Sequence, residues 1–180
     1  MYIYIYIYFS YWIHCKFDLC HVCLRNCMAQ GYRFTLVLEF ASDIEYYWID
    51  GYGYKITYEQ ACVVLLDIFN FFSEDNDRLA SIYFTHSGTI LKLLARLGVA
   101  RDEIPLTHDS FRLHVDNRAW RTTYIDAFAS NIAFVLYDCK SQGPSILFMH
   151  QERIFVRCIF AKLSKEYAMS IVNDERFIPE

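Results

Sequence analysis

The sequence predicts an α/β fold in which helices flank a mixed sheet, and three observations carry this prediction. The apolar run 82–84 has strand-forming residues and is followed at once by a segment with helical periodicity. A second amphipathic helix is predicted after Thr57. Two further apolar runs are separated by a short turn at 140–144, as in a β-hairpin. With 180 residues, the chain has the length of one domain.

The N-terminal segment alternates tyrosine and isoleucine in the run MYIYIYIYF. This alternation is a strong β pattern without charge, and such segments are prone to aggregate. A TA-dinucleotide repeat in DNA also encodes alternating Tyr and Ile, and composition is the first criterion for a low-complexity segment. We therefore favour a translated repeat over a genuine edge strand. The uncharged residues 1–13 lack the basic region of a signal peptide and are too short for a membrane-spanning helix.

The next segment is rich in cysteine and histidine. Its candidate metal ligands are His14, Cys15, Cys20, His21, Cys23 and Cys27. A structural zinc site usually takes two separated pairs of ligands, and no second pair follows. The sequence therefore predicts no metal site and no cofactor.

Two helices are expected in the next part of the chain. The first spans 39–49 and ends near Gly51. The run Thr57-Tyr58-Glu59-Gln60 has the form of a capping box and predicts the start of the second helix. The apolar face of this second helix comprises Ala61, Val64, Leu65, Ile68, Phe69 and Phe72. A polar loop at 73–78 follows.

The most informative stretch is SIYFTHSGTILKLLARLGV, residues 81–99. His86 ends the strand, and Ser87, Gly88 and Thr89 open a helix that we expect to stop at Gly98. A helix N-terminus offers backbone N–H groups and positive dipole charge, which suit an anion such as phosphate. Because glycine has no Cβ, a ligand can come close to the backbone there. The alternative is a strand-turn-helix with an ordinary histidine.

The remaining elements are less regular. Residues 100–122 are polar and mostly irregular, with a break at Pro105. Residues 131–139 are apolar on both faces, as in a central strand. Residues 145–157 form the predicted hairpin partner, and 160–172 form a predicted helix.

The charge pattern argues against general nucleic-acid binding. The net charge is −4, and no basic stripe is visible. An anionic substrate needs a local basic patch, for which Lys92, Arg96, Arg101, Arg118 and Arg121 are available. We expect most of these side chains to be solvated.

Several blocks together resemble a known family. THSGTILKLLARLGV, DEIPLTHDSF, WRTTYIDAFASNIAFVLYDC and ILFMHQE are similar to the C-terminal half of the multiple inositol polyphosphate phosphatases, a branch of the histidine acid phosphatases. The upstream stretch DIEYYWIDGYGYKITYEQACVVLLDIF fits the same family. The resemblance covers about residues 39–153, so we expect 39–160 to be the C-terminal part of a histidine phosphatase domain. Residues 1–30 then lie outside the native domain, and 161–180 form a divergent tail.

The resemblance implies a phosphoglycerate-mutase-like fold with its N-terminal half missing, and a phosphohistidine mechanism. His86 matches the family's phosphate-binding histidine, and Ser87, Gly88 and Thr89 are expected to contact substrate. Gly88 stands where many relatives have the acidic proton donor, which glycine cannot replace. The family's nucleophile lies in an Arg-His-Gly motif, and none of the six histidines here is in that context.

The resemblance leaves three hypotheses. The chain is a truncated phosphatase of inositol polyphosphates (phytate-like) and 2,3-bisphosphoglycerate that is inactive alone and acts with its missing N-terminal half. Alternatively, it is a catalytically dead relative that binds phosphorylated ligands, or a non-functional fragment of a gene model. The family implies the secretory pathway, in the endoplasmic reticulum lumen, at the cell surface or secreted.

Two weaker constellations remain. His108-Asp109 has the His-Asp form that other acid phosphatases use, but it lies in a loop after Pro105. His150-Gln151-Glu152 lies in the last strand block, where packing is the simpler role.

Overall fold

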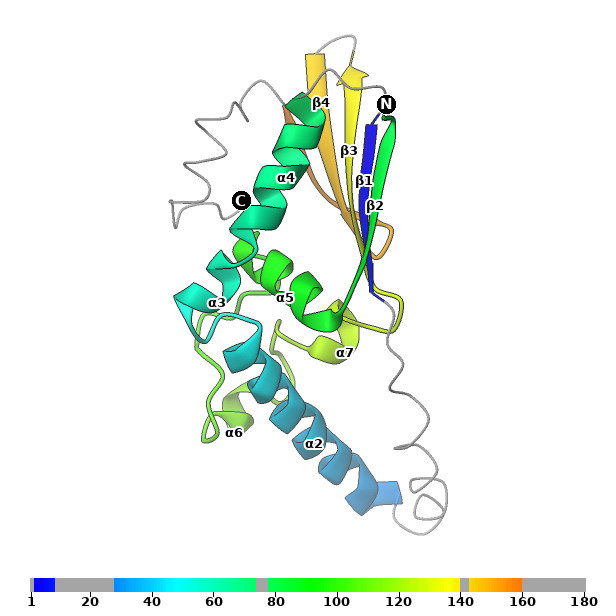
Figure 1. Ribbon diagram of the computed structural model, residues 1–180. Coiled ribbons are helices and arrows are strands. Elements are labelled where there is room, and N and C mark those ends of the chain that lie inside the picture. The colour runs from blue at the N-terminus through cyan, green and yellow to red at the C-terminus, as the bar shows by residue number, and fades with distance from the viewer. Residues whose placement is uncertain (1, 9–27, 74–77, 140–142, 160–180) are drawn as a thin grey trace.

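The computed structural model describes residues 2–8, 28–73, 78–139 and 143–159 (Figure 1). The helices are α2 (Met28–Ile49), α3 (Lys55–Glu59), α4 (Cys62–Ser73), α5 (Ser87–Arg96), α6 (Phe111–His114) and α7 (Thr122–Ile125). The strands are β1 (Tyr2–Tyr8), β2 (Ala80–Thr85), β3 (Asn131–Cys139), β4 (Gly143–His150) and β5 (Arg153–Ile159).

The five strands form one mixed sheet in the order β2-β1-β3-β4-β5. β1 and β2 are parallel, and the other neighbouring pairs are antiparallel. The prediction that 131–139 is a central strand is confirmed, because β3 pairs on both sides. α4 and α5 lie on one side of this sheet, and α2 extends away from it (Figure 1). The predicted α/β class with a mixed sheet is therefore confirmed.

The Tyr/Ile repeat forms β1, an interior strand of the sheet. Its backbone pairs with β2 from Ile3 opposite Ala80 to Tyr8 opposite Thr85. It also pairs with β3, from Tyr2 opposite Leu136 onward. This placement differs from an edge strand, since both sides of the backbone are hydrogen-bonded. That residues 1–30 lie outside the native domain stays a prediction.

The two helices before β2 differ from their predicted bounds. α2 begins at Met28 and not at residue 39. The capping-box prediction was wrong: α3 begins after Tyr54, and Thr57 lies inside it with a buried side chain. The predicted single helix is two helices, α3 and α4, with a break before Cys62. Extended backbone at Tyr54 starts the first turn early, which places Thr57 against the core instead of at a helix end.

The hairpin partner predicted at 145–157 is also two strands. β4 and β5 are joined by Gln151 and Glu152, whose φ angles are +47° and +64°. Tight hairpin turns with positive φ match the twist of the strands, but they usually carry Asn-Gly or Gly residues. The sequence lacks this signal, and so the turn could not be predicted. The helix predicted at 160–172 lies outside the described residues.

The irregular stretch 100–122 is confirmed in the main, with only α6 and the start of α7 inside it. α5 ends as predicted at Gly98, whose φ is +76°. The Val99 N–H donates to the Leu94 carbonyl at 2.9 Å, and the Gly98 N–H donates to the Ala95 carbonyl at 3.1 Å. This is the double hydrogen bond of a glycine-terminated helix.

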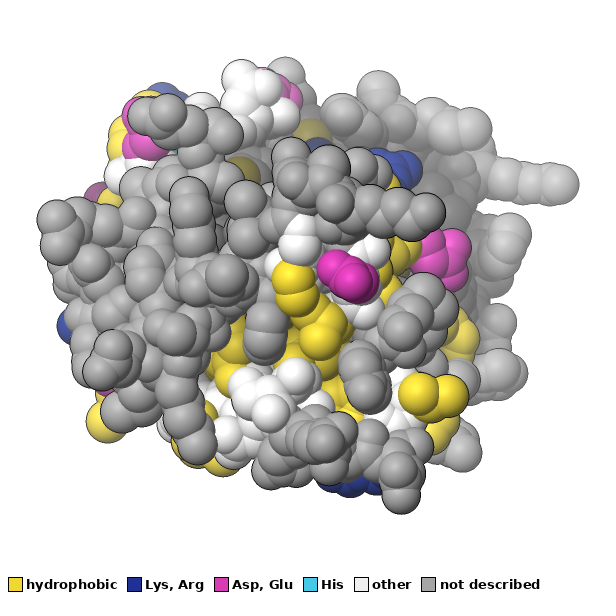
Figure 2. Space-filling model, turned by 90° about the horizontal axis from the view of Figure 1, so that it is seen from above, with side chains coloured by type: hydrophobic (Ala, Val, Ile, Leu, Met, Phe, Trp, Pro, Cys, Tyr) yellow, Lys and Arg dark blue, Asp and Glu magenta, His cyan; other side chains and the backbone are white. Residues whose placement is uncertain are grey.

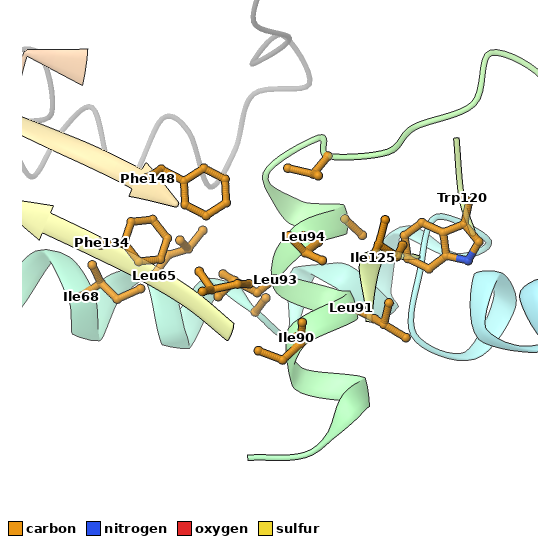
Figure 3. Close-up of a cluster of buried hydrophobic side chains, with 14 of the residues drawn as sticks. Leu65, Ile68, Ile90, Leu91, Leu93, Leu94, Trp120, Ile125, Phe134 and Phe148 are labelled. Atoms are coloured by element: carbon orange, nitrogen blue, oxygen red, sulfur yellow. The ribbon is translucent and has the colours of Figure 1, made fainter. Parts of the chain in front are cut away.

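α5 lies at the centre of the hydrophobic core. Ile90, Leu91, Leu93 and Leu94 have no exposed surface. Figure 3 shows Leu93 on the side of the sheet and Leu91 on the side of Trp120. The core is completed by residues of α4, β3 and β4, among them Leu65, Ile68, Phe134 and Phe148. A helix with buried side chains on opposite sides holds the surrounding elements together.

Apolar side chains also reach the surface. In β2, the edge strand, Ile82 is 53% exposed and Phe84 is 70% exposed. Hydrophobic side chains are visible in the middle of the view from above, beside an acidic one (Figure 2).

Among the described helices, none has both the length and the apolar character needed to cross a bilayer.

We predict that Leu94→Ala lowers the free energy of unfolding by about 2–5 kcal/mol, because it opens a cavity among fully buried side chains. The exposed Leu113 serves as a control for the same chemical change, and Leu113→Ala should cost less than about 0.5 kcal/mol. Urea denaturation of both variants checks this, and equal losses would contradict the central place of α5.

Candidate active site

The predicted site lies at the corner where β2 passes into α5. β2 ends at Thr85, and His86 is the N-cap residue of α5, with extended backbone angles of −114° and 169°. Its imidazole makes no capping hydrogen bond within the described part of the chain. The side chain of His86 is exposed. The imidazole therefore projects from the helix start without serving as a cap.

The first turn of α5 contains the three residues that were expected to contact substrate. Ser87, Gly88 and Thr89 follow His86 directly, so all four predicted site residues are together. The first N–H groups of a helix carry the positive end of its dipole and generally have no acceptor within the helix. In α5 the Thr89 N–H already donates to the His86 carbonyl at 3.1 Å. The Thr85 hydroxyl donates to the Thr89 hydroxyl at 2.8 Å, which fixes the strand end against the helix start.

The space beside Gly88 is filled by Asp50, the residue after the last turn of α2. A Cβ on Gly88 would lie 2.9 Å and 3.0 Å from the two carboxylate oxygens of Asp50. Asp50 Oδ1 also lies 3.3 Å from Lys92 Nζ, in an ion pair that neutralises it. Asp50 thus occupies the space that a side chain at position 88 would enter, and its carboxylate would have to shift to admit one.

A second carboxyl group approaches the helix start from the end of α7. The Ser87 hydroxyl donates a hydrogen bond to Asp126 Oδ2. Asp126 Oδ1 is buried and has no hydrogen-bond partner among the described residues. Burial raises the pKa of Asp126 to about 7, and the negative charge of Asp50 adds to this, whereas the hydrogen bond from Ser87 opposes it. Asp126 therefore holds its proton far more readily than an ordinary aspartate.

A buried ion-pair network anchors α7, which leads into Asp126. Asp43 of α2 accepts hydrogen bonds at Oδ1 from the Thr122 N–H (2.8 Å) and hydroxyl (2.7 Å). Its Oδ2 lies 2.6 Å from Arg118 Nη2, and both side chains are fully buried. The Ile125 carbonyl lies 2.8 Å from His150 Nε2. Contacts on both sides thus fix the short helix that presents Asp126.

Within the described residues, Arg118, Arg121 and Arg101 are engaged by partners other than the predicted site residues. Most of the five basic side chains were expected to be solvated, and Arg118 is an exception because it is buried against Asp43 and Glu39. Arg121 forms a two-pronged pair with Glu39 at 2.8 and 2.9 Å. Arg101 lies over the Tyr52 ring. Lys92 comes near the corner through its pair with Asp50, which packs against the first turn of α5.

The two weaker constellations have local explanations. The Thr107 hydroxyl donates to Asp109 Oδ1 at 2.6 Å, and this hydrogen bond lowers the pKa of Asp109. The carboxyl group is therefore ionised more readily than an ordinary aspartate and has no proton to donate. His150 is buried, and burial lowers its pKa, so it packs as a neutral side chain. Gln151 and Glu152 form a turn and are not part of the predicted strand.

Two residues of this corner, Asp50 and Asp126, are not identified by the sequence alone. Neither belongs to a motif, and each lies 38 residues from Gly88 along the chain (88 − 50 and 126 − 88). Only the fold brings the ends of α2 and α7 to the start of α5.

Metal binding was not expected at this corner or elsewhere. Within the described residues, no group of three or more His, Cys, Asp or Glu side chains could hold a metal ion. The cysteine- and histidine-rich segment 14–27 lies outside the described residues.

We predict that Gly88→Ala lowers the free energy of unfolding by about 1–3 kcal/mol, because the new methyl group meets the Asp50 carboxylate. In an Asp50→Ala background the clash is gone, and the same substitution should be neutral or stabilising, as alanine favours helices over glycine. A double-mutant cycle by chemical denaturation measures the difference, and an equal effect in both backgrounds would refute the contact.

Comparison with known proteins relates the chain to an enzyme family. The chain is 33% identical over 138 residues to human multiple inositol polyphosphate phosphatase 1, covering 71% of this chain and 28% of the relative. It is 30% identical over 121 residues to the Drosophila melanogaster protein of the same name, covering 66% of this chain and 26% of the relative. No protein-family model matches the chain.

Solved structures show the same relationship at the level of the fold. The multiple inositol polyphosphate phosphatase of Bifidobacterium longum in complex with phosphate has a TM-score of 0.59 at 18% identity, covering 76% of this chain and 29% of that one. Its complex with inositol hexasulfate has a TM-score of 0.54 at 20% identity, covering 66% and 25%. The chain thus spans little more than a quarter of the length of these proteins. It is related to the multiple inositol polyphosphate phosphatases and has part of their histidine-phosphatase fold.

Proposed function

We propose that this chain is part of a phosphomonoester hydrolase that acts on inositol polyphosphates, and that His86 and the first turn of α5 bind the phosphate group. The exposed His86 at the N-cap of α5, beside the N–H groups of the first turn, carries this proposal. An imidazole and helix N–H groups are suitable donors to phosphate oxygens. The relatives named for this activity support the choice of substrate.

The substrates that we propose are phytate-like inositol polyphosphates, with 2,3-bisphosphoglycerate as a second one. Both present phosphate esters, so the same helix start serves for either. By analogy with the family we place the protein in the secretory pathway. No metal or nucleic acid is part of this proposal.

We further propose that the chain alone binds phosphate without turning substrate over. Phosphohistidine chemistry needs a second imidazole as nucleophile, and no histidine here is in an Arg-His-Gly context. Another polypeptide segment has to supply this group. The edge strand β2 leads into His86 and offers an apolar surface for such a segment, because its Ile82 and Phe84 side chains are exposed.

A non-catalytic phosphate-binding protein is the second candidate. Gly88 favours this candidate because glycine has no acidic group and the Asp50 carboxylate fills the space beside it. An upstream in-frame Arg-His-Gly motif in the transcript supports the hydrolase. A complete short transcript together with ligand binding supports the non-catalytic protein, and an insoluble chain without transcript support indicates a gene-model fragment.

We predict that His86→Ala weakens the binding of inorganic phosphate to the chain about tenfold or more, since a hydrogen bond to a charged partner contributes about 1.5–3 kcal/mol. NMR titration at about pH 6, followed at the amides of residues 87–89, gives the dissociation constants. His108→Ala removes a histidine from the loop before α6 and is the matched control, with an expected change below about twofold. Equal affinities of wild type and His86→Ala would refute the site.

A further inference from the structure

Two carboxyl groups stand beside a helix start that is expected to bind an anion. Asp50 packs against Gly88, and Asp126 accepts the hydrogen bond from Ser87. Two ionised carboxylates in these places oppose a phosphate by charge repulsion. An anion site at this corner therefore requires that both negative charges are neutralised.

The two carboxyl groups differ in how their negative charge can be neutralised. Asp50 has a cation beside it, because Lys92 Nζ lies 3.3 Å from its Oδ1. Among the described residues, no cation pairs with Asp126: its Oδ2 accepts from Ser87, and its Oδ1 has no hydrogen-bond partner. The remaining way to neutralise Asp126 is to protonate it.

We propose that the start of α5 binds its anion in the form in which Asp126 carries a proton, and that this carboxyl group donates a hydrogen bond to the bound anion. The Ser87 hydroxyl in the first turn of α5 holds Asp126 Oδ2, so this carboxyl group adjoins the helix start. This role rests on the proposed phosphate site and gives that site an acidic group, which Gly88 cannot provide.

The direction of the pH effect follows from the environment of Asp126. Burial, with a smaller contribution from Asp50, raises its pKa to about 7. The carboxyl group is therefore neutral at pH values below this pKa and charged above it. Anion binding is expected to be strong at about pH 5.5 and to weaken as the pH rises through about 7.

Other titratable groups near Asp126 have to be separated from it. Among the described residues these are His86 at the start of α5, Asp50 with its partner Lys92, and His150 beside the Ile125 carbonyl. Burial lowers the pKa of His150, which keeps it neutral in this range. The His86→Gln background removes the imidazole at the start of α5, so any pH dependence that remains there is assigned to Asp126.

The test uses sulfate as the probe, because its charge is constant between about pH 5.5 and 8 and every pH effect then comes from the protein. Sulfate is titrated into four proteins: wild type, Asp126→Asn, His86→Gln and the double variant Asp126→Asn/His86→Gln. Binding is followed by the NMR signals of the amides of residues 87–89. At about pH 8, Asp126→Asn should bind sulfate about tenfold more tightly than wild type, and at about pH 5.5 the two should agree within about threefold. Asp116→Asn, at an exposed aspartate, is the matched control.

A measurement on the wild-type chain keeps the proposal testable if the variant does not fold. The carboxyl carbon NMR signal of Asp126 is followed against pH with and without sulfate. Reciprocal coupling requires its titration midpoint to rise by about one pH unit in saturating sulfate if the affinities differ about tenfold. An unchanged midpoint, or equal sulfate affinity of Asp126→Asn and wild type at high pH, overturns the role of Asp126 alone. If no protein binds sulfate at any pH, the proposed phosphate site fails as well.

Discussion

The burial of α5 is the constraint on which the other elements and the site depend. Four of its side chains have no exposed surface, namely Ile90, Leu91, Leu93 and Leu94. Removing this much apolar surface from water stabilises the fold by several kcal/mol, at about 1.5–3 kcal/mol for each large side chain. Because these side chains point to opposite sides, the sheet packs on one side of α5 and the Trp120 region on the other (Figure 3). The position of the helix start, and hence of His86, is set by this packing.

The candidate site is built where three elements end around that helix. β2 delivers His86, the end of α2 delivers Asp50, and the end of α7 delivers Asp126. The buried pair of Asp43 and Arg118 ties α2 to the segment before α7. Breaking such a pair leaves an unpaired buried charge, which is strongly unfavourable. The network thus acts on the site by positioning α7.

Those parts of the fold that depend on local pattern could be predicted from the sequence. The strand before His86, the stop at Gly98 and the central strand β3 follow from apolar periodicity and from glycine chemistry. The split between α3 and α4 could not be predicted, because the first turn begins after Tyr54 and leaves Thr57 inside the helix. The turn at Gln151 and Glu152 could not be predicted, because it lacks the Asn or Gly that usually marks a turn with positive φ. For the site, the sequence identified residues 86–89 as one group. It could not identify Asp50 or Asp126, whose roles depend on contacts across 38 residues of chain (88 − 50 and 126 − 88).

A crystal structure of the chain with inositol hexasulfate, the ligand of the related bacterial complex, tests the proposed phosphate site most directly. We expect one sulfate group at the start of α5, within hydrogen-bond distance of His86 and of the N–H groups of the first turn. Sulfate bound elsewhere, with this corner free of ligand, would contradict the central claim that the strand-to-helix corner is a phosphate site.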